Sequence, residues 1–147
     1  MTTKNELAEA IVIERTLDAP VANVWQALTE VEQMRQWYFD LKDFRPEAGF
    51  EFEFIIEHEG VTYHHLCKVT EAIPHRKIAY TWRYQGEPGN SLVTFELFPD
   101  SGKTRVNLTH KGIETFPKKQ GFARKNFEAG WTDLIGSELK QFVERKV

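Results

Sequence analysis

The chain has 147 residues, of which 41% are hydrophobic, 13% aromatic and 28% charged, and its formal net charge is -3. This composition is typical of an ordinary folded domain and excludes a fibrous, low-complexity or disordered protein. The small negative charge creates no field that would attract a polyanion, so nucleic acid is not expected as a partner.

The sequence also argues against a membrane or secreted protein. No stretch approaches the ~20 apolar residues that span a bilayer, and the first ten residues lack the apolar core of a signal peptide. The single cysteine, Cys67, cannot form an intramolecular disulfide. We therefore expect a cytoplasmic protein in which residues 1–147 form a single domain.

The first predicted element is a strand over residues 11–17. Ile11, Ile13 and Leu17 lie on one side of it, and polar side chains occupy most of the other, as in a half-buried strand. Arg15 falls on the apolar side, so we expect its side chain to project toward the interior.

Two short helices are predicted after this strand. Pro20 suits a first helical turn, because the N–H that proline lacks would be unpaired there anyway. Thr29 and Glu32 form the Thr-x-x-Glu pattern of a capping box, which predicts a new helix start in the middle of the segment. The expected helices cover about residues 20–28 and 30–37, with one continuous helix as the alternative.

Five further strands and a long helix complete the predicted order. The strand segments alternate in polarity and are separated by Gly, Pro, Asn and Asp; they are residues 49–60, 61–72, 76–84, 91–98 and 103–111. From about Pro117 the apolar period becomes helical, and the apolar stripe consists of Phe127, Trp131, Leu134, Ile135, Leu139 and Phe142. A six-stranded sheet with one apolar face needs a cover, and this helix is long enough to supply it.

Two glycines, Gly130 and Gly136, interrupt the long helix. Each costs about 1 kcal/mol relative to alanine inside a helix. We expect tight packing of the helix against the sheet at these positions; the alternative is that the missing side chains leave space inside.

Many of these segments resemble the activator-of-heat-shock-protein-90-ATPase-like family, within the START-like (SRPBCC) superfamily. The resemblance covers nearly the whole chain and rests on AP-x-x-x-V-W-x-A-L-T, a later tryptophan and a late Gly-Trp pair. These residues are Ala19, Pro20, Val24, Trp25, Ala27, Leu28, Thr29, Trp37, Gly130 and Trp131.

The resemblance implies an α+β helix-grip fold. In this fold a curved six-stranded antiparallel sheet grips the long C-terminal helix, and the two short helices after the first strand close one end. The resemblance also implies a cavity between sheet and helix, which superfamily members often use for apolar or amphipathic small molecules. The eukaryotic namesake of the family stimulates a chaperone.

The candidate ligand-binding residues are those expected to line this interior. They are Arg15, Trp37, Phe52, Phe54, Tyr63, His65, Tyr80, Trp82, Tyr84, Phe95, His110, Phe127 and Trp131. In the functional interpretation, Arg15, His65 and His110 anchor a carboxylate or hydroxyl of the ligand and the aromatic rings form its walls. In the alternative the interior is a filled core, Arg15 pairs with a carboxylate, and the histidines bond to tyrosines or to the backbone.

Neither a metal site nor a catalytic residue is expected. In the segment His64–Cys67 only His65 and Cys67 share a strand face, which supplies too few ligands for zinc, and no cofactor is predicted. A nucleophilic Cys67 would need an accessible setting that stabilises the thiolate, and its surroundings are apolar.

The leading prediction is therefore non-enzymatic binding of a small hydrophobic or amphipathic molecule. One alternative is an adaptor or co-factor for a heat-shock-protein-90-type chaperone, for which Lys118, Lys119, Arg124 and Lys125 would supply a basic surface. Another is an enzyme resembling the cyclases and dehydratases of the superfamily, with a histidine or tyrosine as acid or base.

Overall fold

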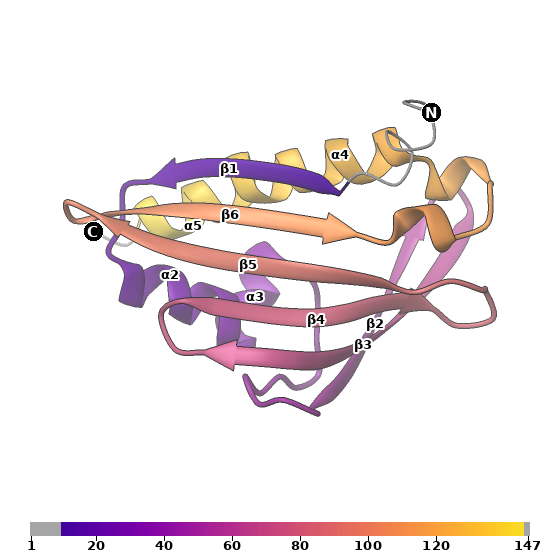
Figure 1. Cartoon of the computed structure of the whole chain (residues 1–147), viewed down its shortest axis with the longest axis horizontal. Coiled ribbons are helices and arrows are strands. Elements are labelled where there is room, and N and C mark those ends of the chain that lie inside the picture. Colours follow the sequence, from indigo (N-terminus) through magenta and orange to yellow (C-terminus); the bar gives the residue numbers. More distant parts are fainter. Residues whose placement is uncertain (1–9, 146–147) are drawn as a thin grey trace.

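The structure, a computed structural model, describes residues 10–145. Six antiparallel strands form one sheet in the order β1-β6-β5-β4-β3-β2. The strands are β1 Ile11–Leu17, β2 Glu51–His58, β3 Val61–Ile73, β4 Lys77–Tyr84, β5 Ser91–Asp100 and β6 Lys103–Lys111. Strands β2 to β6 follow one another as a meander, and β1 pairs with β6, so β1 and β2 are the two edges (Figure 1).

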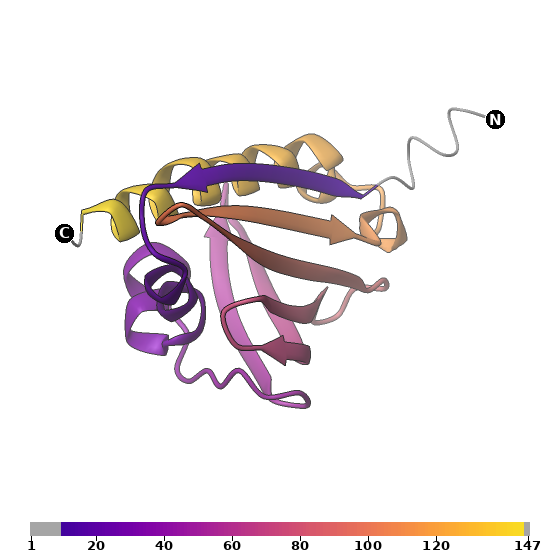
Figure 2. The same cartoon turned by 60° about the vertical axis from the view of Figure 1, so that its left-hand side comes forward.

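The C-terminal helix covers one face of this sheet. It consists of α4 (Arg124–Asp133), a π-helical segment η3 (Leu134–Leu139) and α5 (Lys140–Glu144). Figure 2 shows it running along the β1 side of the curved sheet. No helix within residues 10–145 is long and apolar enough to cross a membrane.

The predicted helix start near Pro117 is wrong. The segment before α4 instead forms two short 3-10 turns, η1 (Ile113–Thr115) and η2 (Gln120–Phe122). Phe116 is extended, as the residue before a proline tends to be, and its ring is buried. The ring of Phe122 is also buried, so this segment closes one end of the interior before the helix begins.

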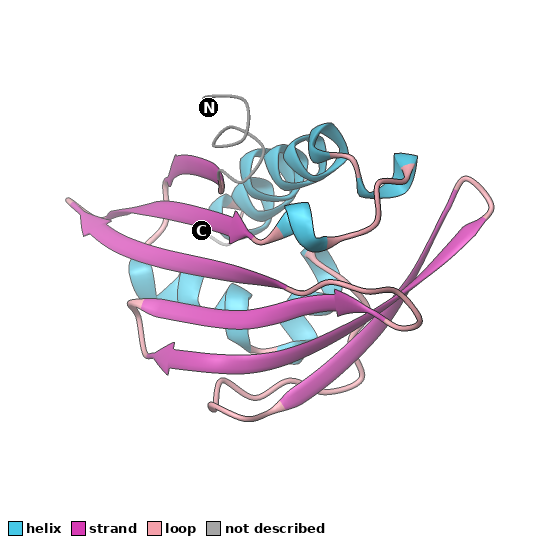
Figure 3. Ribbon diagram, turned by 45° about the vertical axis from the view of Figure 1, so that its right-hand side comes forward, coloured by secondary structure: helices cyan, strands magenta, loops and turns pink. Residues whose placement is uncertain are grey.

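The predicted break between the two short helices is confirmed. The helices are α2 (Val21–Thr29) and α3 (Val31–Trp37), and Glu30 between them is extended, with φ -93° and ψ 122°. The indole N–H of Trp37 donates to the carbonyl of Ala27 at 2.7 Å, which holds α3 against α2. The helices lie behind the sheet in Figure 3.

The predicted capping box, by contrast, is wrong. The Thr29 hydroxyl donates to the carbonyl of Trp25 at 2.7 Å, and no side chain caps the start of α3. A threonine commonly bonds in this way to the carbonyl four residues earlier. Thr29 is buried, and its hydroxyl makes its hydrogen bond within α2, so it does not cap the next helix.

The register of the sheet confirms the predicted alternation of side chains. His65 lies opposite Phe54 on one side and Tyr84 on the other, and Val93 lies opposite His110. These side chains are all buried. A β-bulge between Val69 and Glu71 shifts the pairing of β3 with β4, but it leaves the aromatic positions on the inner face.

The two helix glycines differ in their surroundings. At Gly136 a Cβ would lie 3.3 Å from Nε of Arg15, the end of an exposed side chain of β1, so the close contact there is with a flexible side chain and not with the backbone of the sheet. At Gly130 the expectation is wrong, because the residue is exposed and a Cβ would meet no atom within 4 Å.

This difference predicts unequal gains in the free energy of unfolding from two Gly→Ala substitutions. We expect Gly130→Ala to raise the free energy of unfolding by about 0.5–1 kcal/mol, because it reduces backbone entropy in the unfolded chain and meets no clash. Gly136→Ala should gain less, since the Arg15 side chain must shift. Urea unfolding of the two variants measures both values, and a Gly130→Ala variant less stable than the unaltered protein would contradict the prediction.

Candidate functional site

The residues predicted to line the interior are buried, with two exceptions. Tyr63 is half-buried and Arg15 is exposed. The buried ones are Trp37, Phe52, Phe54, His65, Tyr80, Trp82, Tyr84, Phe95, His110, Phe127 and Trp131. The structure therefore places these aromatic candidates in one buried core, with contributions from the sheet, α3 and α4.

A stack of three flat rings stands at one side of this interior. The ring of Phe39 lies on that of Phe54, with centroids 4.4 Å apart and an interplanar angle of 12°. The ring of Phe54 lies on that of His65 in the same way, at 4.3 Å and 12°. Phe39 belongs to the loop between α3 and β2 and is only half-buried, so it forms the outer layer of the stack.

A pair of tyrosines lies beside this stack. The hydroxyl oxygens of Tyr38 and Tyr80 are 2.7 Å apart and share a hydrogen bond. Burial raises the pKa of both hydroxyls well above the usual value, so both are neutral donors. The Tyr38 ring also lies 4.4 Å from the Phe39 ring, measured between centroids.

Sequence reasoning missed Tyr38 and Phe39. Both follow the last residue of α3 directly, where the helical stripe no longer assigns side chains to a face. The available signal was three consecutive aromatic residues, Trp37 to Phe39, at a helix end. The aromatic rings of such a run extend beyond the end of the helix, and they are large apolar groups that we expect to be buried.

His110 belongs to a continuous chain of hydrogen bonds. The indole N–H of Trp131 donates to Nδ1 of His110 at 2.9 Å, so Nε2 carries the ring proton and donates to Oγ of Ser91 at 2.8 Å. The Ser91 hydroxyl in turn donates to the carbonyl of Trp82 at 2.7 Å. Burial lowers the pKa of His110 to about 3, so the imidazole is neutral.

His65 is also bonded within the protein. Its Nδ1 lies 3.1 Å from the carbonyl oxygen of Tyr63, to which it donates. Burial lowers the pKa of His65 to about 4, although the nearby carbonyls of Tyr63 and Phe54 act in the opposite direction. His65 thus has the backbone partner that the filled-core alternative predicts. His110 also bonds within the protein, but its partners are an indole and a serine hydroxyl and not a tyrosine or the backbone.

The predicted inward projection of Arg15 is wrong. Arg15 lies on β1, which is an edge strand. The long side chain of Arg15 therefore passes over Gly136 and reaches solvent, as long cationic side chains tend to. One guanidinium nitrogen, Nη1, donates to the carbonyl of Glu14 at 2.7 Å. Arg15 therefore does not join the two histidines.

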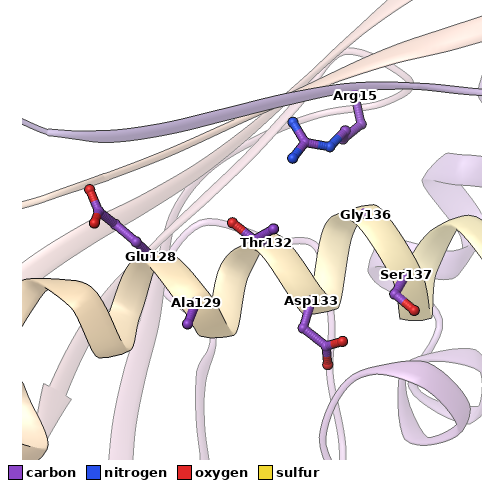
Figure 4. A pocket seen from close by; sticks show the side chains of 7 residues that line it. All are labelled: Arg15, Glu128, Ala129, Thr132, Asp133, Gly136 and Ser137. Carbon is purple, nitrogen blue, oxygen red and sulfur yellow. The ribbon is translucent and has the colours of Figure 1, made fainter.

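Arg15 instead overhangs an open hollow between β1 and the C-terminal helix. Figure 4 shows the Arg15 and Thr132 side chains on the side of the helix that faces β1, with Asp133 on the other side. The lining is Arg15, Glu128, Ala129, Thr132, Asp133, Gly136 and Ser137. A second hollow, lined by Thr81, Asn90, Ser91, Leu92, Lys111, Gly112 and Glu114, is likewise free of aromatic side chains.

The remaining histidine, cysteine and acidic side chains of the described residues form neither a metal site nor an activated thiol. No group of three or more His, Cys, Asp or Glu residues within the described chain has the geometry of a metal site. Burial raises the pKa of the Cys67 thiol far above its usual value, which suppresses the thiolate. His64 is paired with Glu53 on the outer face of the sheet.

The basic residues around the start of α4 are partly neutralised. Nζ of Lys119 lies 3.1 Å from a carboxylate oxygen of Glu87, and Nε of Arg124 lies 3.0 Å from one of Glu128. Surface pairs of this kind contribute little stability, but they reduce the positive charge presented to an acidic partner.

The architecture and the comparisons with known proteins agree. The family model described as "Activator of Hsp90 ATPase homolog 1-like protein" matches residues 18–144. The chain belongs to this family. None of the curated proteins matches it closely enough to count as a relative.

Several solved structures have the same fold as this protein over nearly its whole chain. Protein MLL2253 from Mesorhizobium loti has a TM-score of 0.76 and 25% identity, and the match covers 95% of this chain and 99% of that one. Protein CV1439 from Chromobacterium violaceum has a TM-score of 0.77 and 23% identity, with coverage of 92% and 97%. Protein BH1534 from Bacillus halodurans has a TM-score of 0.71 and 25% identity, with coverage of 91% and 96%. The predicted helix-grip fold is thus confirmed.

The two buried histidines predict acid destabilisation. In the unfolded chain a histidine has a pKa near 6.5, whereas in the folded protein the values are about 4 for His65 and about 3 for His110. Their neutral forms therefore favour folding above about pH 6.5, and this stability is lost as the pH falls. We expect the free energy of unfolding to drop by about 2 kcal/mol per histidine between pH 7 and pH 5.

Urea unfolding at the two pH values measures this drop. His58→Gln, which removes an exposed histidine, should show the same pH dependence as the unaltered protein. Equal unfolding free energies at pH 7 and pH 5 would contradict the assignment of neutral buried imidazoles.

The hydrogen-bond chain predicts a cost for Ser91→Ala. The substitution leaves the Nε2 proton of His110 buried without its acceptor, so we expect a loss of about 1–3 kcal/mol in unfolding free energy. Ser137→Ala, which removes a helix hydroxyl bonded to the exposed Gln141 side chain, should change stability by less than about 0.5 kcal/mol. Urea unfolding measures both effects. Similar effects of the two substitutions would show that the hydrogen bond between His110 and Ser91 has no stabilising role.

Proposed function

We propose that the protein binds a small hydrophobic or amphipathic molecule between the sheet and the C-terminal helix, without catalysing a reaction on it. The observation that carries this proposal is the position of the Phe39 ring. It lies flat on Phe54 at the edge of an aromatic interior, it comes from a loop, and it is only half-buried. A flat ring of a ligand would take the same place once Phe39 turns outward.

The walls around this place suit an apolar ligand. Besides Phe54, the rings of Tyr38, His65 and Trp82 have centroids 4.4, 6.2 and 6.2 Å from that of Phe39. Aromatic rings at such distances stabilise one another by stacked and edge-to-face contacts, and a ligand ring gains the same contacts. Small-molecule sites typically combine such walls with a few polar groups.

The protonation states favour binding over catalysis. A general base near neutral pH needs a pKa near 7, and burial holds the pKa of His65 near 4 and that of His110 near 3. The carboxylate nearest to a histidine, Glu53 beside His64, lies on the outer face and not in the interior. The enzyme alternative therefore gains no support from these groups.

The chaperone alternative stays a prediction. The family name carries it, but two of its four basic residues, Lys119 and Arg124, form ion pairs within the protein. A cytoplasmic location likewise stays a prediction, and residues 1–9, on which part of it rests, lie outside the described residues.

The test is an NMR amide-shift titration with a panel of aromatic amphiphiles and fatty acids. We expect saturable shifts in the unaltered protein that cluster around Phe54, His65 and Trp82. Phe39→Ala should bind about tenfold tighter, because the ligand no longer has to displace a ring, and tenfold corresponds to about 1.4 kcal/mol.

Phe50→Ala is the matched control. Phe50 precedes β2 and is half-buried like Phe39, but its ring lies against Phe44, with centroids 6.1 Å apart, so its removal creates space away from the Phe39 position. It should not improve affinity. Absence of saturable shifts in the unaltered protein would overturn the proposal even if Phe39→Ala bound a ligand, because an engineered apolar cavity takes up small molecules by itself.

A further inference from the structure

The hydroxyl pair of Tyr38 and Tyr80 has a proton with no acceptor. Two hydroxyl groups carry two protons, and the single hydrogen bond between the two oxygens, 2.7 Å long, uses one of them. Within residues 10–145 neither hydroxyl makes another hydrogen bond. Tyr80 is 1% exposed and Tyr38 is half-buried. When Tyr38 is the donor, the unused proton is that of the Tyr80 hydroxyl, in a position where protein groups normally find a partner.

The other polar groups of the interior are already committed. His110 accepts from Trp131 and donates to Ser91, and His65 donates to the carbonyl of Tyr63. The indole N–H of Trp82 donates to the hydroxyl of Tyr84. The tyrosine hydroxyls are thus where donor capacity remains.

The interior is poorly suited to a carboxylate. Arg15, predicted to neutralise one, lies outside the interior, and both buried histidines are neutral. A buried anion without a cation is costly, whereas a neutral oxygen needs only a hydrogen-bond donor. Neutral hydroxyls can provide that donor without a charge of their own.

The pair also lies beside the place that a ligand would occupy. Tyr38 is next to Phe39 in the chain, and their ring centroids are 4.4 Å apart. The Tyr38 ring further contacts Trp131 and Phe95, at centroid distances of 6.3 and 6.4 Å, which positions its hydroxyl toward β4.

We propose that the Tyr38–Tyr80 pair is the polar anchor of the site and selects ligands with an uncharged acceptor oxygen, such as a ketone, over carboxylates. This inference rests on the proposed function. One hydroxyl donates to its neighbour, and the neighbour donates to the ligand oxygen. Tyr84, the last residue of β4 and four residues beyond Tyr80, has a similar unused proton and is a separate donor.

The experiment compares three ligands of nearly equal shape. They are 2-acetylnaphthalene, a neutral ketone; 2-isopropylnaphthalene, in which a methyl group and a hydrogen stand in place of the carbonyl oxygen; and 2-naphthoate, a carboxylate. Without a donor in the site, the isopropyl compound should bind tightest, because it loses least hydration. With the tyrosine anchor, we expect the ketone to bind about fivefold to tenfold tighter than the isopropyl compound, and the carboxylate to bind weakest.

The double variant Tyr38→Phe/Tyr80→Phe tests the anchor itself. A single substitution would leave one hydroxyl able to donate, whereas the double variant removes both and keeps the two rings. Replacing both partners of a hydrogen bond by apolar groups of the same shape is close to neutral for folding. We expect the order of ketone and isopropyl affinities to reverse in this variant.

Thr29→Val is the matched control. It removes a buried hydroxyl that donates to the carbonyl of Trp25 within α2, outside the proposed site, and should leave the ketone preference unchanged. A ketone preference that persists in the double variant, or is lost in Thr29→Val, would overturn the anchor assignment. Equal or tighter binding of the isopropyl compound by the unaltered protein would overturn it too, while the proposed function stands. Binding of none of the three compounds would count against the proposed function itself.

Discussion

The hydrogen-bond chain from Trp131 through His110 and Ser91 to the carbonyl of Trp82 fixes the C-terminal helix to the sheet. It connects α4 with β6, β5 and β4, and each link is buried. Apolar contacts alone would allow a helix to slide or rotate on the sheet, but directional bonds to an indole specify one position. The position of Trp131 then determines where the Tyr38 ring packs.

The same chain decides which polar groups the interior can offer. A buried histidine that both accepts and donates is satisfied and stays neutral, so it contributes structure and neither charge nor a spare donor. The tyrosines differ, because a hydroxyl can accept one hydrogen bond and still hold a proton. In the proposed site, such groups would distinguish ligands by neutral oxygen acceptors and by the shape of flat rings, and the cost of burying a charge would disfavour free carboxylates.

Sequence reasoning predicted the burial of the aromatic side chains on the strands well and the positions of the residues at the edge of the interior poorly. Side chains of Phe54, His65 and Trp82 alternate along strands, and period-two alternation assigns a face directly. Tyr38 and Phe39 lie just beyond a helix end, where no period applies. Arg15 obeyed the alternation but lies on an edge strand, and its length lets it reach water across Gly136.

The sequence by itself determined the order of the elements, the face of each strand and the family. Local periodicity and turn residues carry the order and the faces, because they act over a few neighbouring positions, and the motif residues carry the family. The break between α2 and α3 was predicted from a capping box that the structure does not form, so that prediction was right and its physical reason was wrong. Only the tertiary structure decided the start of α4, the outward course of Arg15 and the pairing of Tyr38 with Tyr80. Each of these depends on contacts between residues far apart in the chain, which compete for the same buried space and the same hydrogen-bond partners.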